Sequence, residues 1–243
     1  MHQGNGLQDK RVVVLGGSSG IGLAVAQLAA AQGAKVVIAS SNAERVEKAV
    51  ASAGREVQGQ AVDLSDERAV ATFFSKLGPF DHLVFTAGDS LHLHELAATD
   101  LQQARHAFEL RYWAALAAVK YGSPYIRQHG SIVLTTGIAG QRPRKGWVIA
   151  ASVCGTIEAL ARALAIELAP LRVNAVSPGM VRTNLWQNMG AEEREALFAS
   201  VGKSLPVGRV GEASDIAQAY LFLMQEGFST GQTLVVDGGT VLV

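Results

Sequence analysis

Three glycines, Gly16, Gly20 and Gly22, directly follow the apolar run RVVVL and precede a segment of helical character. Glycines at this spacing let the backbone turn tightly and approach a pyrophosphate, whose charge the amides of the following helix attract. A tight strand-to-helix turn without a ligand would need similar residues. Because the turn follows the first strand, a dinucleotide site is favoured. Its residues are expected to be Gly16, Ser18, Ser19, Gly20, Ile21 and Gly22.

The elements that must position this turn are short apolar runs alternating with helical segments. Candidate strands cover residues 11–15, 35–39, 57–62, 82–85, 131–135, 172–177 and 233–236. One helix face is marked, at steps of three or four residues, by Val153, Ile157, Leu160, Leu164 and Leu168. Continuous apolar strands between helices predict a parallel sheet covered on both faces. We therefore predict an α/β fold, a single doubly wound Rossmann-type domain over residues 1–243 with a seven-stranded parallel sheet flanked by helices on both faces.

The composition limits the classes of function. The 243 residues include 21 Lys plus Arg, 21 Asp plus Glu and one cysteine. Zero formal charge argues against nucleic acid or an anionic membrane as a partner, and one cysteine excludes an intrachain disulfide and a cysteine-cluster metal site. The start MHQGNGLQDK is unlike a signal peptide, and no window approaches 18 uninterrupted apolar residues. We expect a cytoplasmic, soluble protein without a metal.

Residues 183–210 interrupt the alternation of strands and helices. They include Trp186, Met189 and a charged helical run, AEEREALF. Such a stretch is long for a connection within a compact domain. It is either a substrate loop or lid inserted in the domain, or a surface helix with no part in the site.

The glycine turn resembles the TGxxxGxG turn of short-chain dehydrogenases/reductases, and the resemblance continues along nearly the whole chain. Asp63-Leu64 is similar to the motif that holds the adenine amino group, and Thr86-Ala87-Gly88 resembles the end of the NNAG motif. The run from Pro178 through Gly179 and Val181 to Thr183 resembles the PGxxxT loop that contacts the nicotinamide carboxamide. Residues 231–239 resemble the C-terminal segment of the family. The resemblance implies a nicotinamide cofactor bound by Asp63, Leu64, Ala87, Gly88, Pro178, Gly179, Val181 and Thr183, and a carbonyl or alcohol substrate.

Two positions depart from the family within these motifs. Leu15 stands where the family usually has Thr, and Thr86 follows Phe85 where it has two Asn residues. Neither change removes an amide that binds phosphate. Local geometry in the turn is expected to differ.

The choice of cofactor is indicated at the end of the second strand. A carboxylate there accepts from the ribose hydroxyls and selects NAD, but this chain has Ser40, Ser41 and Asn42, and its first acid is Glu44. Hydroxyl and amide donors tolerate a 2′-phosphate, and Arg45 adds positive charge. The sequence favours NADP(H) over NAD(H).

The resemblance places the family's catalytic residues on positions that this chain has changed. In the family a Tyr exchanges a proton with the carbonyl oxygen, a Lys lowers its pKa, a Ser polarises the same oxygen and an Asn orders a water. These positions fall on Ala150, Cys154, Gly137 and Arg111, respectively. Loss of a general acid costs about 10²–10⁴-fold in rate. The resemblance thus implies a divergent member that lacks the usual catalytic set.

Several side chains are candidates to replace the missing groups. Arg111 could polarise a carbonyl or form a salt bridge within an oligomer or to a helix C-terminus, and Thr136 lies next to the vacated Ser position. His94, with His92, lies near the expected substrate entrance and could act as an acid, but exposed loop residues are commoner there. Lys145 belongs to a charge run typical of a solvated turn. Cys154 fits a small buried residue better than a nucleophile.

Three hypotheses follow from these residues. The first is an NADP(H)-dependent oxidoreductase of low activity with a non-standard active site, acting on a reactive aldehyde, ketone or dicarbonyl. The second is a non-catalytic NADP(H)-binding pseudoenzyme that acts as a sensor or interaction module, and the third is a structural protein without a cofactor. Loss of the Tyr and Lys side chains enlarges the substrate space, which Trp113, Trp147, Trp186 and Met189 could line for a bulky or aromatic molecule. By resemblance we expect a homodimer or homotetramer, built through residues 99–121 and 152–168.

Overall fold

The main sheet of the computed structural model has seven parallel strands in the order β3-β2-β1-β4-β5-β6-β9. The model describes residues 6–89 and 93–243. The strands are β1 (Arg11–Leu15), β2 (Lys35–Ser40), β3 (Val57–Ala61), β4 (Phe80–Phe85), β5 (Ile126–Thr135), β6 (Arg172–Pro178) and β9 (Thr233–Val236). The predicted doubly wound fold with a seven-stranded parallel sheet is confirmed.

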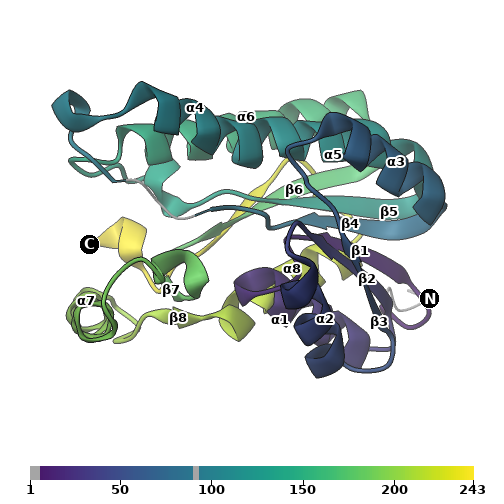
Figure 1. Ribbon diagram of the computed structural model, residues 1–243, viewed down its shortest axis with the longest axis horizontal. Coiled ribbons are helices and arrows are strands. Elements are labelled where there is room, and N and C mark those ends of the chain that lie inside the picture. The colour runs from purple at the N-terminus through teal and green to yellow at the C-terminus, as the bar shows by residue number, and fades with distance from the viewer. Residues whose placement is uncertain (1–5, 90–92) are drawn as a thin grey trace.

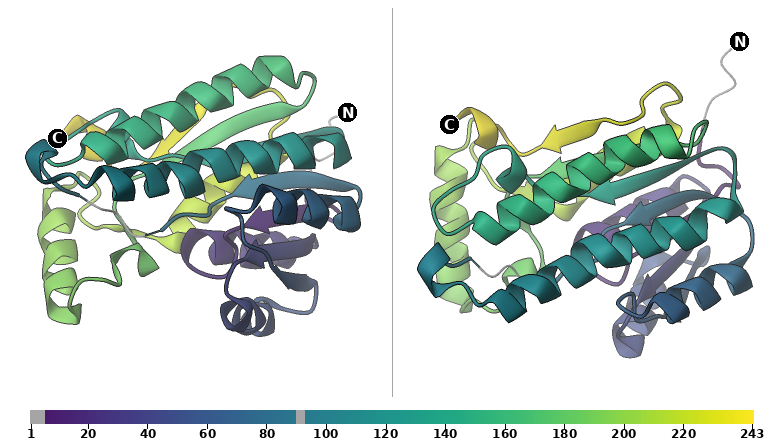
Figure 2. Two further views of the ribbon diagram at one scale, coloured as in Figure 1. Left: turned by 45° about the horizontal axis from the view of Figure 1, so that its top comes forward. Right: turned by 90° about the horizontal axis from the view of Figure 1, so that it is seen from above.

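Helices cover both faces of this sheet (Figures 1 and 2). One face carries α3 (Glu67–Leu77), α4 (Leu101–Phe108), α5 (Ala114–Gly122) and α6 (Val148–Glu167). The other carries α1 (Gly20–Ala31), α2 (Ala43–Ala53) and α8 (Ala213–Gln225). Each layer buries its own apolar cluster against the sheet, with Phe73 and Ile157 in one and Val25 and Tyr220 in the other.

The strand order reverses between β1 and β4. After β3 the chain crosses back to pair β4 with the free side of β1, and β5 and β6 follow outward. In open α/β sheets, ligands bind at the carboxyl ends of the strands at such a reversal. The fold therefore predicts a cleft between the turn after β1 and the loop after β4.

Two strands begin earlier than their apolar patterns indicate. β4 starts at Phe80, and β5 starts at Ile126 although residues 127–129 are exposed. The register shifts between Phe80 and His82, and His129 has a φ of 67°. This irregular start leaves polar side chains facing solvent, so the apolar pattern marked only the regular part of β5.

The helix α6 carries the apolar face that the spacing predicts. Val153, Ile157 and Leu160 are buried, whereas Leu164 and Leu168 pack at the edge of the same cluster. Among helices in the described residues, α6 alone has the length and apolar composition to cross a membrane, a test that core helices of other proteins also pass. Glu158 and Arg162 interrupt its sequence, and its buried face packs on the sheet.

A second, very small sheet was not predicted. β7 (Val181–Arg182) pairs in parallel with β8 (Gly211–Glu212). Between them lie the 3₁₀ turn η5 (Asn184–Trp186) and helix α7 (Ala191–Ser204). Two-residue strands carry too little apolar pattern to be identified from sequence. They bring the two ends of residues 183–210 together beside the main sheet.

Candidate functional site

A cavity of about 840 Å³ opens where the carboxyl ends of β1, β4, β5 and β6 meet. The turn after β1, the loop after β4, the end of β5 and the loop after β6 all contribute to its lining. Every cofactor residue predicted from the sequence lines this cavity except Asn42. The motifs that are far apart in the chain therefore meet at one site.

The glycine turn shapes the inner end of the cavity. Gly16 and Gly20 have φ values of 85° and 53°, in the left-handed region that favours glycine. A side chain at Gly16 would place its Cβ 2.5 Å from the Ala87 amide nitrogen, and one at Gly22 would strike the Gly16 carbonyl oxygen and the Thr86 hydroxyl. That hydroxyl donates to the Leu15 carbonyl at 3.0 Å. Thr86 thus ties the turn to β4 at a position where the family usually has Asn.

The start of α1 is left open toward the cavity. Its N-cap residue, Ser19, makes no side-chain hydrogen bond to the helix, and no acidic residue lies in the first turn. Backbone amides at a helix start attract anions through their partial positive charge. Ser18, Ser19, Gly20 and Ile21 all line the cavity here. This arrangement fits a pyrophosphate.

The side chains after β2 and β3 line a second part of the cavity. Ser40, Ser41 and Arg45 lie after β2, and Asp63 lies after β3 with its carboxylate fixed by the Ser65 amide at 2.9 Å. Asn42 is placed differently from the prediction, because its side-chain oxygen accepts from the Arg45 amide at 2.8 Å and caps α2. Asn is among the preferred N-cap residues. Its amide is therefore used by the helix and lies outside the lining formed by the described residues.

The loop after β6 closes the cavity near the C-terminal segment. A side chain at Gly179 would place its Cβ 2.7 Å from the Asp237 Cα. Asp237 accepts from the amides of Gly239 and Val241, each at 2.8 Å, and so orders the final turn. Pro178, Gly179, Val181 and Thr183 line the cavity together with Ala87 and Gly88.

The four positions on which the resemblance places the family's catalytic residues lie together at this end. Gly137, Ala150, Cys154 and Arg111 all line the cavity. A Cβ at position 137 would lie 3.3 Å from the Cys154 Sγ, so the thiol takes up the space beside the glycine. The Thr136 hydroxyl donates to the Cys154 carbonyl at 2.9 Å. Thr136 is thus near the site, as expected, but its hydroxyl proton is already used in a hydrogen bond to a carbonyl of α6.

Burial decides the state of the Cys154 thiol. It raises the pKa of Cys154, against smaller lowering effects from the Thr136 hydroxyl and the Arg111 charge. The residue is therefore protonated at neutral pH. A neutral, mostly buried thiol is a poor nucleophile, which agrees with its interpretation as a small buried residue.

Arg111 lies on the π-helical turn η2 (Glu109–Trp113), which connects α4 to α5. Its Nε lies 3.4 Å from Asp89 Oδ1, and its Nη2 donates to the Asp89 carbonyl oxygen. The guanidinium covers Gly88, where a Cβ would come within 2.8 Å of it. The salt bridge is therefore internal, to the loop after β4, whereas the sequence suggested one to an oligomer partner or a helix end. Both side chains keep 24% exposure and both line the cavity.

The other polar candidates lie away from the cavity. His94 is exposed and does not contribute to the lining made by the described residues, and His92 lies outside those residues. Lys145 pairs with Glu95 at 2.7 Å on the surface. These positions agree with the solvated-loop interpretation of His94 and Lys145.

Comparison with known proteins decides the family. A profile described as enoyl-(acyl carrier protein) reductase matches residues 16–241. The short-chain dehydrogenase/reductase ATR9 of Stachybotrys chlorohalonatus is 37% identical over 97% of this chain and 98% of its own length. The chain belongs to the short-chain dehydrogenase/reductase family.

Two solved structures show how closely this short-chain dehydrogenase/reductase keeps the family fold. A small-chain dehydrogenase in complex with NADPH is 37% identical, with a TM-score of 0.85 over 97% of this chain and 100% of that one. The MalC reductase/Diels-Alderase of Malbranchea aurantiaca is 32% identical, with a TM-score of 0.90 over 98% of both chains. The chain is thus an oxidoreductase by family, with a site that fits a nicotinamide cofactor.

Residues 183–210 of this short-chain dehydrogenase/reductase form one wall of the cavity. Leu185 and Trp186 of η5 and Leu197 and Val201 of α7 line it. Trp147, before α6, lines it too. Trp113 is 53% exposed, and neither it nor Met189 belongs to the lining that the described residues form. Two of the four residues expected around an enlarged substrate space are therefore in place.

Three residues of the site with ionisable side chains were not identified from the sequence. Asp89, His106 and Arg144 line the cavity. Asp89 directly follows the Thr86-Ala87-Gly88 motif, which could have drawn attention to it. His106 and Arg144 belong to no motif, so only the packing of α4 and of the loop before α6 reveals them. Within residues 6–89 and 93–243, no group of three His, Cys, Asp or Glu side chains could hold a metal ion.

Proposed function

We propose that this protein reduces reactive carbonyl compounds with NADP(H), by hydride transfer that is weak or rearranged because the usual catalytic side chains are replaced. One observation carries the proposal. The Arg111 guanidinium lines the same cavity as Pro178, Gly179 and Thr183, the loop that resembles the nicotinamide-binding loop of the family. When bound, the nicotinamide supplies the hydride.

The side chains at this end determine which carbonyls are suitable substrates. Arg111 can donate hydrogen bonds to a developing oxyanion, but a guanidinium stays protonated in proteins and does not act as a general acid. Gly137 and Ala150 carry no acidic proton, and the Thr136 hydroxyl is hydrogen-bonded to Cys154. The Cys154 thiol keeps its proton because burial raises its pKa. The proton for the carbonyl oxygen must then come from water or from an ionisable residue elsewhere in the cavity lining, such as His106. A dicarbonyl or aldehyde, which needs less acid catalysis, fits better than a simple ketone.

The alternative function is that of an NADP(H)-binding pseudoenzyme, a sensor or interaction module. Its support is the contrast between a well-formed phosphate turn and a set of catalytic positions without the Tyr that serves the family as general acid. It predicts binding of the dinucleotide without hydride transfer. The names of two relatives, a dehydrogenase and a reductase/Diels-Alderase, favour the enzyme.

The proposed cofactor is NADP(H) rather than NAD(H). Ser40, Ser41 and Arg45 line the cavity where the adenosine ribose of a dinucleotide is expected. Glu44 is 73% exposed and pairs with Lys48 at 2.6 Å, so it does not take the place of the carboxylate that selects NAD. The related dehydrogenase in complex with NADPH supports the same choice.

The proposed setting is a cytoplasmic homodimer or homotetramer that binds neither nucleic acid nor a membrane. Large apolar side chains lie exposed on the helical layer of α4, η2 and α6, at Leu101, Trp113, Val148 and Ile166. A second copy would cover them. Sedimentation velocity tests the assembly, because a monomer at all concentrations would contradict it.

The experiment that tests the function combines binding and turnover in one sample. Calorimetric titrations with NADPH and with NADH are followed by measurement of NADPH oxidation with a panel of dicarbonyls, aldehydes and simple ketones. We expect binding, slow oxidation with dicarbonyls and little reaction with simple ketones. Binding without oxidation across the panel would support the pseudoenzyme. Failure to bind either NADPH or NADH would contradict both.

A further inference from the structure

Trp186 is held in place by one hydrogen bond and one aromatic contact. The residue lies in η5 and lines the cavity. Its indole nitrogen donates to the Val181 carbonyl at 3.0 Å. Phe198 of α7, only 3% exposed, meets it edge to face with ring centroids 6.3 Å apart. The indole therefore contacts both α7 and the two-stranded sheet of β7 and β8, here called the mini-sheet.

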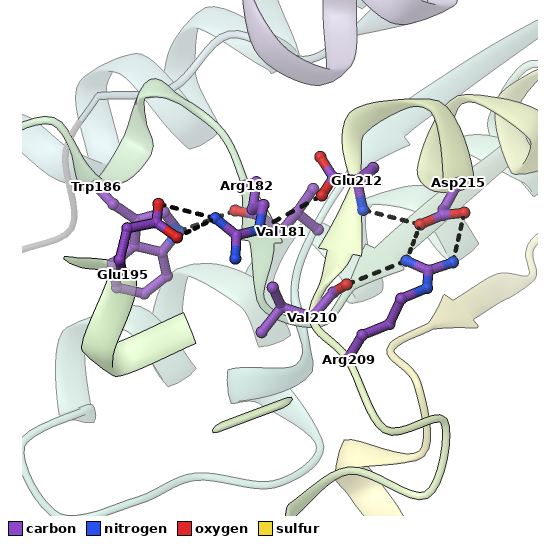
Figure 3. A network of polar contacts seen from close by, with 8 residues as sticks. All are labelled: Val181, Arg182, Trp186, Glu195, Arg209, Val210, Glu212 and Asp215. Carbon is purple, nitrogen blue, oxygen red and sulfur yellow. Dashed lines mark hydrogen bonds and ion pairs between the residues drawn. The ribbon is translucent and has the colours of Figure 1, made fainter. Parts of the chain in front are cut away.

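Arg182 holds these two elements together (Figure 3). Its Nη1 donates to both carboxylate oxygens of Glu195 on α7, at 2.8 and 2.7 Å, and its Nε lies 3.5 Å from Glu212 on β8. The guanidinium carbon lies 4.6 Å from the centroid of the Phe198 ring. Arg182 does not belong to the cavity lining formed by the described residues. It acts on the cavity through Phe198 and Trp186.

A single exposed ion pair would contribute little. Here one guanidinium serves two carboxylates and covers a buried aromatic ring, which adds a cation–π contact. Its removal would leave Glu195 and Glu212 without the charge between them. The packing of α7 against β7 and β8 would be less stable. The Trp186 side chain, which contacts Phe198 of α7, would then be held less rigidly.

We propose that Arg182 is a positioning residue for substrate: by clamping α7 to the mini-sheet, it fixes Trp186 as a rigid wall that selects planar, aromatic carbonyl compounds. The inference deepens the proposed function and rests on the same cavity. Leu185, Leu197 and Val201 extend the apolar wall beside Trp186, and Trp147, the N-cap residue of α6, also lines the cavity. A flat aromatic molecule buries more of this surface than a small aliphatic one, and stacks on a fixed indole without ordering it first.

The test measures binding, so that it does not depend on turnover. The protein, saturated with NADP⁺, is titrated calorimetrically with two α-diketones, planar aromatic acenaphthenequinone and small aliphatic diacetyl. We expect Arg182→Gln to weaken acenaphthenequinone binding about tenfold, the equivalent of about 1.4 kcal/mol, and to leave diacetyl and NADP⁺ affinity within about twofold. Arg182→Lys, which keeps the charge, should recover part of the loss.

Arg209→Gln is the matched control. Arg209 pairs with Asp215 at 2.6 and 3.0 Å, at the other end of residues 183–210, and its partner is on α8 rather than α7. We expect no change in the preference for acenaphthenequinone. If Arg182→Gln does not fold, Trp186→Leu takes its place and should lower acenaphthenequinone affinity without lowering that of diacetyl.

Three results would overturn the inference: wild-type protein that binds acenaphthenequinone no more tightly than diacetyl, equal loss of both in Arg182→Gln, or no loss of either. The proposed function fails separately. If Arg182→Gln loses the preference for acenaphthenequinone but no protein oxidises NADPH, the positioning role of Arg182 holds and the proposed reductase activity does not. If NADPH is oxidised but Arg182→Gln keeps the wild-type preference for acenaphthenequinone over diacetyl, only the positioning role of Arg182 is wrong.

Discussion

The two ends of the cavity are built in different ways. At the phosphate end the backbone forms the site: Gly16 and Gly22 have no room for a side chain, and the start of α1 presents its amides. Around Arg111 and the start of α6 side chains form the site: the Arg111–Asp89 pair, the neutral Cys154 thiol and the bare positions Gly137 and Ala150. The first end fits a cofactor through constraints on the main chain, whereas the chemistry of the second depends on which side chains stand there.

This difference is in keeping with the proposal that the chain keeps the family's cofactor site and has changed its catalytic positions. A substitution at Gly22 disturbs the turn, β4 and α1 together, because all three meet there. A substitution at Ala150 or Cys154 changes only groups at the cavity wall. The two ends are thus expected to respond independently to mutation.

The largest expected effect is at the phosphate turn. Gly22→Val would drive a side chain into the Gly16 carbonyl and the Thr86 hydroxyl. We expect NADPH affinity to fall about 1,000-fold, or about 4 kcal/mol, in a calorimetric titration. Gly155→Ala is the control, because its Cβ would meet nothing within 4 Å, and it should bind NADPH normally. Equal NADPH affinity of Gly22→Val and wild type would contradict the claim that the backbone of the glycine turn forms the phosphate site.

The sheet beneath both ends has its own response to acid. Burial lowers the pKa of His82 from 6.5 to about 4, and its Nδ1 lies 2.9 Å from the Ser131 hydroxyl. The unfolded chain therefore takes up this proton at higher pH than the folded protein, so stability is lost as pH falls from 6.5 toward 4. The free energy of unfolding should drop by about 3 kcal/mol from this group.

Urea denaturation at several pH values measures this loss. His82→Gln should be less stable at pH 7 but show a shallower dependence on pH, whereas exposed His94→Gln should behave as wild type. Since the sheet supports both ends, acid should remove cofactor and substrate binding together. An unchanged slope in His82→Gln would assign the acid sensitivity to other groups.

A substitution at Arg111 tests only the part of the cavity that side chains form. Arg111→Met removes the hydrogen-bond donor for a developing oxyanion, and we expect kcat for dicarbonyl reduction to fall about 100-fold. NADPH affinity should stay within about twofold of wild type, because no phosphate contact is lost. Exposed Arg105, on the preceding helix, provides the control Arg105→Met. A parallel loss of NADPH affinity in Arg111→Met would show that the two ends are coupled.

The smallest effect is expected at the adenosine part of the cofactor end. Ser41→Asp places a carboxylate beside the expected 2′-phosphate, so NADPH affinity should fall about tenfold while NADH affinity rises. Asn42→Asp adds the same charge one residue later, outside the cavity lining of the described residues, and Asp caps a helix as well as Asn does. It should change the preference much less. Equal effects of the two variants would contradict the assignment of Ser41 to the ribose.

The fold and the cofactor end could be predicted from sequence because their signals are local. The bounds of β1 and β9 were predicted correctly, since each is a short apolar run with clear ends. The glycine turn was recognisable because glycine is required where the backbone reaches φ values of 85° and 53°. The start of β5 was missed because its first residues are polar and irregular.

The side-chain end could not be predicted because its contacts join distant residues. Arg111 was identified as a candidate, but its partner Asp89 is 22 positions away, and the pair depends on a π-helical turn that no pattern indicates. Asn42 was assigned to the cofactor by its position after β2, but its side chain caps α2 by accepting a hydrogen bond from the Arg45 amide. The Arg182 clamp depends on a sheet of two-residue strands.

The most direct test of the account is a single-turnover experiment with wild-type protein and the variant Gly137→Ser/Ala150→Tyr/Cys154→Lys. Both proteins are saturated with NADPH, mixed with acenaphthenequinone and followed by loss of NADPH absorbance, after calorimetry has established their NADPH affinities. We expect similar NADPH affinity for the two proteins and hydride transfer at least about 100-fold faster in the variant, the scale of a restored general acid. Wild-type protein that already transfers hydride as fast as the variant would contradict this expectation.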